Sequence, residues 1–513
     1  MAETFAISRA HLMYGVCLPI AVLVGYFLAS PQDSDSLAVL ILILSVLSVP
    51  VLMKWNFPLL ILSWNAPLYF PFLPGSLTFC NIMVAISLSF ALLNRSLGKS
   101  KGYFFEARSV ARSLIFLGIV VLATAYLTGG IGVRALGSDS FGGKKYFYIL
   151  LGISGFFALA AHRVTKTQAM LFAYLFFLSG VVIFIGYLVP PLAPGADFIH
   201  SLLPVEQTED QPLGTSVTIA RMGNLNNATL AIFCFLLMRY GIRGVFDLLK
   251  PWRMGALLLV VAVSLLGGFR SIIVLYSLII ASLFYLENLI RSRYFVSAVV
   301  AAGMLGIILI PQVQKLPLSV QRTLSFLPIA VDPTARSDAE ASTQWRLDMW
   351  KQLLPEVPKH LIKGKGYALN PDEMFGIYQS GLRGFGESAD FARYAGDYHS
   401  GPFSLIIPFG LFGVAAFVWF VAASIRLLHN NLKHGDPDFK RVNTFIMAVF
   451  LARVAFFVFV FGSISTDLIT LTGLVGLSVS LNGAKTSAEE DPAEASAPAL
   501  LQESYSRRRQ IAA

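Results

Sequence analysis

Four cationic side chains are the strongest candidates for chemistry in this sequence: Arg221, Arg270, Arg346 and His399. An unperturbed imidazole titrates at a pH of about 6.5, so His399 can act as a general base at neutral pH. Guanidinium groups bind phosphate oxygens bidentately and stabilise charge on a leaving group. Several arginines beside one histidine therefore suit a pyrophosphate, which the arginines would hold without a metal ion while the histidine deprotonates an attacking hydroxyl. Taken alone, His399 is more typical of a solvated surface histidine.

His399 stands where a long polar segment ends and an apolar helix is predicted to begin. Ser400 suits the N-cap of that helix and Pro402 suits its first turn. Gly410 and Gly413 follow eleven and fourteen residues after His399. Their lack of side chains would permit close packing against neighbouring helices. This position places His399 where lipid meets the aqueous phase.

Arginines inside apolar segments need a partner or a purpose, because each costs at least about 2.5–3.5 kcal/mol to insert into a membrane helix. Arg221 is predicted about one turn into a span, and a glycine and three asparagines follow it. Arg270 is predicted at the outer end of a pair of helices. Both side chains can instead reach the outer headgroups or cap helix ends. Arg453 lies deeper, and its expected partner is Asp467 across a short outer turn.

The elements that must position these residues are membrane helices. Of 513 residues, 56% are hydrophobic and 13% are charged, whereas a soluble protein has about 25% charged residues. A net charge of +10 favours nucleic-acid binding in a soluble protein, but here the membrane explains it and no nucleic-acid partner is expected. Cys17, Cys80 and Cys234 lie in apolar runs without the spacing of metal or disulfide sites, which predicts a packing role.

Apolar runs long enough to cross about 30 Å of hydrocarbon recur along almost the whole chain. We predict an all-α polytopic membrane protein with about 12–14 transmembrane helices and one large extracytoplasmic loop domain. The candidate spans are 12–30, 37–54, 57–73, 78–94, 112–129, 147–161, 167–189, 217–239, 254–268, 270–287, 294–311, 402–427, 443–461 and 466–482. The predicted domains are 1–311 with the N-terminal transmembrane helices, 312–401 with the loop domain, 402–483 with the C-terminal transmembrane helices, and 484–513 as a disordered cytoplasmic tail.

The charge of each loop predicts the membrane side that it faces, because Lys and Arg concentrate in cytoplasmic loops. The basic loops at 95–112, 162–166, 239–253, 291–293 and 426–441 are predicted to be cytoplasmic, and the acidic loops at 31–36 and 190–215 to lie outside. The outer loop 130–146 is discordant, since it contains Arg134, Lys144 and Lys145. Contact with solvent or lipid headgroups explains it, and so does a role in holding an anionic lipid substrate.

With this topology, the four candidate residues come from separated parts of the chain yet lie at one membrane face. At these residues the sequence resembles the O-antigen ligase and O-antigen polymerase superfamily of bacterial membrane enzymes. The strongest match is His399-Ser400, then nine residues, Gly410, two residues and Gly413. Weaker matches are Arg221 with its glycine and asparagines, Arg270 in place of a Ser-Arg-Gly element although Phe269 and Ser271 flank it, and Arg346-x-x-x-Trp350 leading into Gly364-Lys365-Gly366. The resemblance covers about residues 215–415.

The resemblance implies a multi-pass enzyme of the bacterial inner membrane, and the loop charges predict that both termini lie in the cytoplasm. Such an enzyme transfers a glycan, with inversion and without a metal or cofactor, from an undecaprenyl-pyrophosphate donor to a hydroxyl on the extracytoplasmic face. His399 would be the base, Arg221 and Arg270 would hold the diphosphate, and Arg346 and Ser400 would contact the substrate. The acceptor would be a lipid core, another glycan or a protein. Ligase and polymerase remain equally open.

Two other functions compete with this one. A metal-dependent glycosyltransferase that uses polyprenyl-phosphate sugars would place acidic ligands in an outer loop, where Asp33 and Asp35 lie, although such acids are usually just solvated. A lipid-glycan transporter or flippase would bury acids near the middle of broken helices, but the predicted spans hold almost no Asp or Glu away from their ends. The glycines at 364–366 are predicted to form a tight turn and not a nucleotide site.

Overall fold

The computed structural model describes most of the chain between residues 34 and 483. The described residues are 22, 25, 34–70, 77–98, 103–130, 143–192, 202, 203, 207–210, 219–369, 373, 375, 392, 393 and 395–483. Almost all of the predicted first span, the tail from 484 onward and the greater part of the loops 130–146 and 190–215 lie outside them. So do Cys17, Asp33, Arg134 and the side chain of Asp35. The chain divides into two compact units, Met1–Leu59 and Leu60–Ala513.

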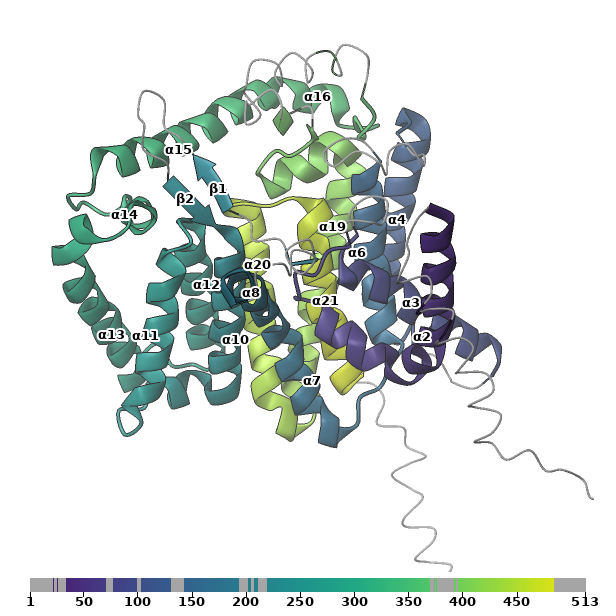
Figure 1. Ribbon diagram of the computed structural model, residues 1–513, viewed down its shortest axis with the longest axis horizontal. Coiled ribbons are helices and arrows are strands. Elements are labelled where there is room, and N and C mark those ends of the chain that lie inside the picture. The colour runs from purple at the N-terminus through teal and green to yellow at the C-terminus, as the bar shows by residue number, and fades with distance from the viewer. Residues whose placement is uncertain are drawn as a thin grey trace, which may run out of the picture. The chain divides into compact units, whose positions relative to one another are not determined.

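Helices make up nearly all of the described structure, as the composition predicted (Figure 1). Up to residue 192 they are α2 (Ser34–Ser63), α3 (Phe79–Ser96), α4 (Arg108–Thr128), α6 (Lys144–Ala160), α7 (Lys166–Leu178), η1 (Ser179–Val182) and α8 (Ile183–Leu192). Two short strands follow, β1 (Gln207–Asp210) and β2 (Ile219–Met222), and they pair antiparallel. The remaining helices are α10 (Gly223–Val245), α11 (Pro251–Leu265), α12 (Ser271–Leu286), α13 (Arg293–Leu309), η2 (Ile310–Lys315), α14 (Leu318–Leu324), α15 (Pro333–Leu353), η3 (Leu354–Glu356), α16 (Val357–His360), α19 (Gly401–His434), η4 (Pro437–Phe439), α20 (Lys440–Phe459) and α21 (Ile464–Asn482).

Eight helical segments within the described residues are long and apolar enough to cross a membrane. They are Phe79–Ser96, Arg108–Thr128, Lys166–Tyr187, Gly223–Val245, Arg293–Lys315, Gly401–His434, Pro437–Phe459 and Ile464–Asn482. Shorter apolar helices are Leu47–Ser63, Pro251–Leu265 and Ser271–Leu286. The helical, multi-pass membrane class is therefore confirmed, and the full number of about 12–14 spans stays a prediction.

Two predicted spans differ from the structure. The span at 57–73 is not a separate helix, because α2 continues through residues 55 and 56 and ends at Ser63. Pro67 follows soon after, and proline disfavours helical conformation in the residue before it. The helix predicted at 217–239 begins late, because Ile219–Met222 form β2 and α10 starts at Gly223. Arg221 therefore lies on a strand ahead of the helix, so its predicted place inside the helix was wrong.

Helices α10, α12 and α20 run between the same two ends of the bundle. At one end, the backbone N–H of Met222 donates to Gly267 O at 3.1 Å, which joins the start of α10 to the turn between α11 and α12. At the other end, a Cβ on Gly241 would lie 3.9 Å from both Glu287 Oε1 and Arg441 Nε. Figure 1 shows α10, α11 and α12 side by side, with α20 next to them.

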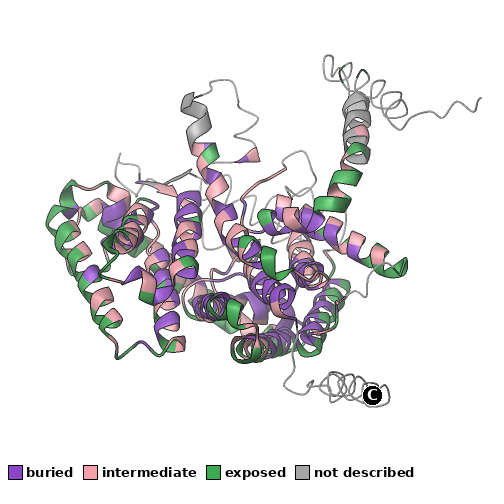
Figure 2. Ribbon diagram, turned by 90° about the horizontal axis from the view of Figure 1, so that it is seen from below, coloured by how far each residue is buried: buried purple, intermediate pink, exposed green. Residues whose placement is uncertain are grey.

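Small and hydroxyl residues bring α6 and α21 together. A Cβ on Gly152 would lie 3.2 Å from the backbone of α21, so the glycine permits this approach. Thr472 Oγ1 donates to Gly152 O at 2.8 Å, and Ser480 Oγ donates to Leu159 O at 2.6 Å. In Figure 2 buried residues gather where helices face one another. Helix α13 buries only Ala301, and the rest of its apolar surface is available to lipid.

Helix α19 is interrupted at Gly410, whose φ of 64° lies in the left-handed region. The backbone N–H groups of Lys365 and Gly366 donate to two carbonyl oxygens just before the break, at 2.7 and 3.0 Å. The turn predicted at 364–366 lies just ahead of these residues, at 361–363, and Gly364 and Gly366 follow it with left-handed φ values of 74° and 69°. The helix packing predicted for Gly410 was wrong in kind, because its missing side chain leaves room for the carbonyl groups of Leu361 and Ile362, which lie in this turn and not in a helix.

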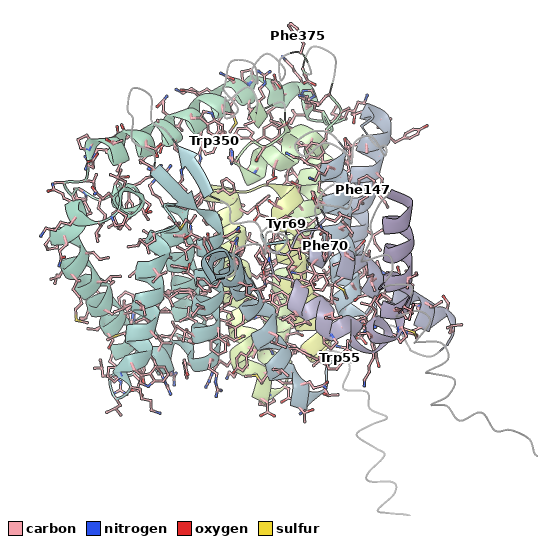
Figure 3. All side chains as sticks on the ribbon, in the orientation of Figure 1. Trp55, Tyr69, Phe70, Phe147, Trp350 and Phe375 are labelled. Atoms are coloured by element: carbon pink, nitrogen blue, oxygen red, sulfur yellow. The ribbon has the colours of Figure 1, made fainter. Side chains whose placement is uncertain are left out.

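Helices α14, α15 and α16 lie within the predicted loop segment 312–401. Helix α14 packs against α11, α15 and β2, and α16 packs against α19. Figure 1 shows α15 running across the upper end of the bundle. Trp350, labelled in Figure 3, donates from Nε1 to Tyr398 O at 3.0 Å and so ties α15 to the segment before α19. The boundaries of a separate loop domain stay a prediction, since these helices belong to the unit Leu60–Ala513.

Candidate functional site

Arg270 lies at the N-cap of α12 and reaches across to α15. Its Nη2 donates to Ala339 O at 2.7 Å and to Thr343 Oγ1 at 3.0 Å. A guanidinium carries five N–H donors, so these bonds fix the side chain and leave most of its donors for other partners. Arg270 is therefore held at the junction of the helix bundle and α15.

Arg221 lies beside the turn that carries Arg270. A Cβ on Gly268 would lie 3.2 Å from Arg221 Cγ, so the arginine stem runs directly over this glycine. A Cβ on Gly267 would overlap the side chain of Asn226, which belongs to the asparagine segment after Arg221. Two close approaches thus require glycines here, and they bring Arg221 and Arg270 to the same end of the bundle, as the predicted topology required.

A buried ion pair is bonded to this turn, and the sequence gave no local signal for it. Arg322 on α14 is only 3% exposed and pairs through Nε with the carboxylate of Asp338 on α15. Its Nη1 also donates to Gly268 O at 2.5 Å. Both residues lie in a polar segment where charges are ordinary, so only their burial in the fold distinguishes them. The pair connects α14, α15 and the turn that carries Arg270.

Arg346 and His399 meet at one aromatic ring. The Arg346 guanidinium carbon lies 5.7 Å from the centre of the Phe461 ring, and the His399 ring centre lies 5.1 Å from the same point. On its other side, the imidazole ring centre is 5.1 Å from that of Trp345, in an edge contact. Phe461 follows α20 and gave no sequence signal, because a phenylalanine in an apolar run is ordinary. The structure thus brings Arg346 and His399 together.

The backbone at His399 is held in an unusual conformation. Its φ of 46° is left-handed, and Asn288 is the other described non-glycine residue with a positive φ. Such conformations cost on the order of 1–3 kcal/mol and occur often at functional sites. Ser400 occupies the N-cap of α19 and Pro402 lies in its first turn, as predicted, although the Ser400 side chain makes no capping hydrogen bond. The Ser400 hydroxyl therefore follows His399 directly in the chain and does not cap the helix.

Two further charged residues, Asp397 and Lys145, lie near His399. Asp397 Oδ1 is 4.0 Å from His399 Nδ1, which is too long for a hydrogen bond but close enough for electrostatic attraction. Lys145, from the discordant loop 130–146, lies near Asp397, and its Nζ is 5.6 Å from the centre of the Tyr367 ring. Burial lowers the pKa of Lys145 to about 8, and attraction to Asp397 partly opposes this shift. Lys145 comes ahead of the apolar run 147–161.

Positive charge is crowded at this end of the bundle. Burial lowers the pKa of Arg270, the guanidinium groups of Arg322 and Arg346 lower it further, and Asp338 opposes the shift. Burial and then Arg322 also lower the pKa of Arg346. Arginines stay charged in proteins despite such shifts. The site therefore has like charges close together, and an anion placed among them would relieve their repulsion.

Other predicted details have mixed outcomes. Cys80 and Cys234 are buried and unpaired, as expected of packing residues. The predicted partnership of Arg453 with Asp467 is confirmed only as an electrostatic attraction without direct contact. The Asp467 carboxylate accepts from Ser463 N at 2.9 Å, and Arg453 lines a separate cavity of about 80 Å³. Asp467 lies in the first turn of α21, where a carboxylate satisfies backbone N–H groups that the helix leaves without partners.

The comparison with protein families agrees with this arrangement. Residues 254–418 match the family model described as O-antigen ligase. The matched region contains Arg270, Arg346, His399 and the broken helix at Gly410, and it begins after Arg221. No curated protein matches the chain. The chain is thus a multi-pass membrane protein that carries, at residues 254–418, a domain of the O-antigen ligase family of enzymes.

Proposed function

We propose that this protein is a metal-independent membrane glycosyltransferase. It transfers a glycan from an undecaprenyl-pyrophosphate donor to an acceptor hydroxyl on the extracytoplasmic face. The observation that carries the proposal is the convergence of Arg221, Arg270, Arg346 and His399, from four separated parts of the chain, at one end of the helix bundle. The family match supports a lipid-linked glycan as the substrate class.

The proposed reaction is a single displacement at the anomeric carbon. His399 takes the proton from the acceptor hydroxyl while its oxygen attacks from the side opposite the pyrophosphate. The bond between the anomeric carbon and the phosphate oxygen breaks, and its electron pair leaves with the lipid pyrophosphate. The new glycosidic bond therefore has inverted configuration, and the proton remains on the imidazole until solvent removes it.

The arginines stabilise the charge that develops on the departing pyrophosphate. Two hydrogen bonds, to Ala339 and Thr343, fix Arg270 to α15. Arg346 is itself a residue of α15. Donors that are held in place before the reaction lower the barrier without reorganisation during it. Arg322 and Asp338 act as positioning residues, because they lock the turn that carries Arg270 to α14 and α15.

The surroundings of His399 suit a base. The Trp345 and Phe461 rings hold the imidazole from two sides and limit the access of water. When the imidazole gains a proton, the Asp397 carboxylate 4.0 Å away stabilises the resulting charge. Trp345 Nε1 and Asp397 Oδ1 are buried and have no hydrogen-bond partner among the described residues. Buried polar atoms are nearly always hydrogen-bonded, so both atoms are available to a substrate.

Transfer by the purified full-length protein in proteoliposomes tests this proposal. The donor is an undecaprenyl-pyrophosphate glycan, the candidate acceptors are a lipid core, a second repeat unit and a protein, and EDTA is present throughout. We expect formation of a new glycosidic bond with inverted configuration. Transfer that stops with EDTA and returns with Mg²⁺ or Mn²⁺ would favour the metal-dependent alternative and direct attention to Asp33 and Asp35. Movement of the lipid-linked glycan across the bilayer without a new bond would favour a transporter.

The same assay separates ligase from polymerase. A ligase accepts the lipid core or protein, whereas a polymerase extends the donor glycan by further repeats. A product ladder whose length grows with donor concentration in the absence of any other acceptor indicates a polymerase.

A further inference from the structure

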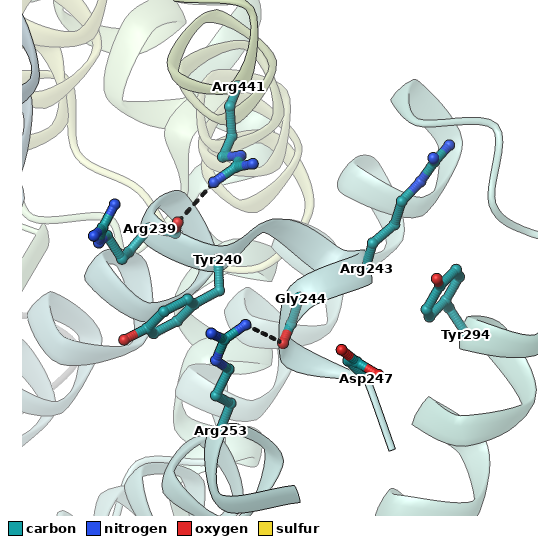
Figure 4. A pocket seen from close by; sticks show the side chains of 8 residues that line it. All are labelled: Arg239, Tyr240, Arg243, Gly244, Asp247, Arg253, Tyr294 and Arg441. Atoms are coloured by element: carbon teal, nitrogen blue, oxygen red, sulfur yellow. Dashed lines mark hydrogen bonds between the residues drawn. The ribbon is translucent and has the colours of Figure 1, made fainter. Parts of the chain in front are cut away.

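A basic pocket lies at the far end of α10 from Arg221 (Figure 4). Its volume is about 450 Å³, and it opens to the surface between the end of α10 and the starts of α11, α13 and α20. Its lining includes Arg239, Arg243, Arg253, Arg441, Asp247 and Tyr294. Arg239, the first residue of the lining, comes 16 residues after the start of α10 at Gly223, a rise of roughly 24 Å. The pocket is therefore distinct from the site around His399 and faces the opposite side of the membrane.

The geometry at the end of α10 holds two of these arginines in place. The helix is interrupted at Gly241, whose φ is 65°. Arg441 Nη1 donates to Arg239 O at 2.9 Å, and Arg253 Nη1 donates to Gly244 O at 3.2 Å, as the dashed lines in Figure 4 mark. Each bond uses one of five N–H donors on a guanidinium, so both groups remain able to bind an anion.

An aromatic ring fixes the plane of one guanidinium. The Arg253 guanidinium carbon lies 4.2 Å from the centre of the Tyr240 ring, which is a close cation–π contact. Arg253 Nε is buried and has no hydrogen-bond partner among the described residues. A guanidinium held by both a carbonyl and a ring loses little freedom when it binds phosphate, which favours binding.

The pocket carries an excess of positive charge. Its four arginines are opposed by Asp247 in the lining and by Glu287 beside Gly241, which leaves an excess of two positive charges. Asp247 Oδ1 already accepts from Leu249 N at 3.1 Å. Burial raises the pKa of Glu287, although a backbone hydrogen bond, Arg243 and Arg441 oppose the shift. The chain therefore does not neutralise its own arginines here.

The loop beside the pocket is apolar and exposed. Leu248, Leu249 and Trp252 are 70%, 89% and 58% exposed, and they lie between the arginines that end α10 and the one that begins α11. Tryptophan is enriched where membranes meet water, and leucine at this exposure belongs in hydrocarbon rather than in bulk water. A soluble anion would gain nothing from these apolar side chains. A molecule with both a phosphate and acyl chains can bind the arginines and the apolar side chains together.

We propose that this pocket binds the phosphate headgroup of an anionic phospholipid, with Leu248, Leu249 and Trp252 against its acyl chains. The lipid belongs to the leaflet opposite the His399 site. By the charge of its loops this leaflet is the cytoplasmic one. Bound there, the lipid links α10, α11 and α20, and it is a structural ligand separate from the glycan donor.

Lipid binding by the full-length protein in a neutral detergent tests the proposal. Native mass spectrometry with phosphatidylglycerol or phosphatidylcholine as the probe gives the affinity for each lipid. The double variant Arg239→Gln, Arg243→Gln removes two exposed charges and leaves the bonds of Arg253 and Arg441 to α10 intact. Arg426→Gln, exposed and outside the pocket lining, is the matched control.

The wild type and Arg426→Gln should bind one phosphatidylglycerol with an affinity about tenfold or more above that for phosphatidylcholine, and the double variant should lose this preference. Arg243→Lys, which keeps the charge, should retain most of it. Should the double variant unfold, Arg243→Gln alone replaces it. Equal affinities for the two lipids in the wild type, or an unchanged preference in the folded double variant or in Arg243→Gln, would overturn the proposal. So would displacement of phosphatidylglycerol by millimolar inorganic phosphate or pyrophosphate, which would make this a site for a soluble anion.

Discussion

At the scale of single residues, the arginines of the His399 site differ in how firmly they are held. Arg270 makes two hydrogen bonds to α15, so its removal changes both charge and structure. Arg346 is half-buried against Phe461 and is crowded by Arg322, which makes it the cleaner probe of pyrophosphate binding. A guanidinium that stabilises the leaving group should matter most in the transition state.

Arg346→Ala should lower kcat/KM for the lipid-pyrophosphate donor by about 10²–10³-fold, the usual loss when one charge-stabilising donor is removed. Arg346→Lys should recover part of this loss, because it keeps the charge without the bidentate geometry. Steady-state transfer rates at varied donor concentration measure both. Lys351→Gln, an exposed change on the same helix, is the control and should behave as wild type. A kcat/KM for Arg346→Ala within twofold of wild type would remove Arg346 from the site.

Lys145 gives a prediction about pH. Its pKa in the folded protein is about 8, below the ordinary 10.5. Charged Lys145 therefore opposes folding below pH 8, and this cost falls away as the pH rises from 8 to 10.5. Lys145→Met should raise stability by about 1–3 kcal/mol at pH 7, and by much less at pH 10.5.

Thermal unfolding of the purified protein at the two pH values measures this effect. Lys351→Met, on an exposed side chain, should shift Tm little at either pH. A Tm increase for Lys145→Met that is the same at both pH values would mean that improved packing, and not the loss of a charge, is responsible.

At the scale of elements, the broken helix α19 and the segment 361–366 form one unit. Leu411 N donates to Leu361 O at 2.7 Å just past the break, and a Cβ on Gly410 would lie 2.5 Å from the same oxygen. Gly410 is also left-handed, so alanine there meets both a clash and an unfavourable φ. These contacts hold α19 near its break, and His399 and Ser400 precede the first residue of the same helix.

Gly410→Ala should therefore destabilise the protein by about 2 kcal/mol or more and lower Tm by several degrees. Gly255→Ala is the matched control. It lies within α11, where an added Cβ meets nothing within 4 Å, and it should leave Tm unchanged or slightly raised. Thermal unfolding of both variants decides the matter. Equal Tm values for the two would show that the interrupted helix at Gly410 is not under this constraint.

Much of the site followed from loop charge and a few motifs. The alternation of basic and acidic loops was enough to place Arg270, Arg346 and His399 at one end of the bundle. The pair of Arg322 and Asp338 was missed because ion pairs between polar segments have no sequence period. Gly410 was misread, because a glycine in an apolar run looks alike whether it packs against a helix or admits a turn. Arg221 was misplaced, because β2 takes its backbone partners from β1, outside the predicted span, and from Gly267, 45 residues after Met222.

At the scale of the whole molecule, the account requires two opposed faces. The His399 site lies at one end of α10, α12 and α20, and the basic pocket lies at the other. Loop charge predicts that the first face is extracytoplasmic and the second cytoplasmic. We expect the bilayer to lie between the two faces, around the exposed apolar surface of α13 and the eight candidate spans of the described residues.

Labelling with a membrane-impermeant maleimide tests this orientation in intact cells. In a variant whose three native cysteines are replaced by alanine, Lys351→Cys on α15 should be labelled from outside. Lys433→Cys, near the end of α19, should react only after the membrane is opened. The two residues lie on opposite sides of the predicted bilayer. Labelling of both from the same side would therefore contradict the topology.

The most direct test of the central claim is transfer by His399→Ala at a matched amount of folded protein with EDTA present. His399→Asn is measured beside it, because asparagine tolerates the left-handed backbone of this position and separates lost chemistry from lost conformation. The account predicts that both variants still bind the lipid-pyrophosphate donor with wild-type affinity, and that glycan transfer falls by about 10²–10⁴-fold in each. Transfer by His399→Ala at the wild-type rate would contradict the account, because a different group would then have to remove the acceptor proton.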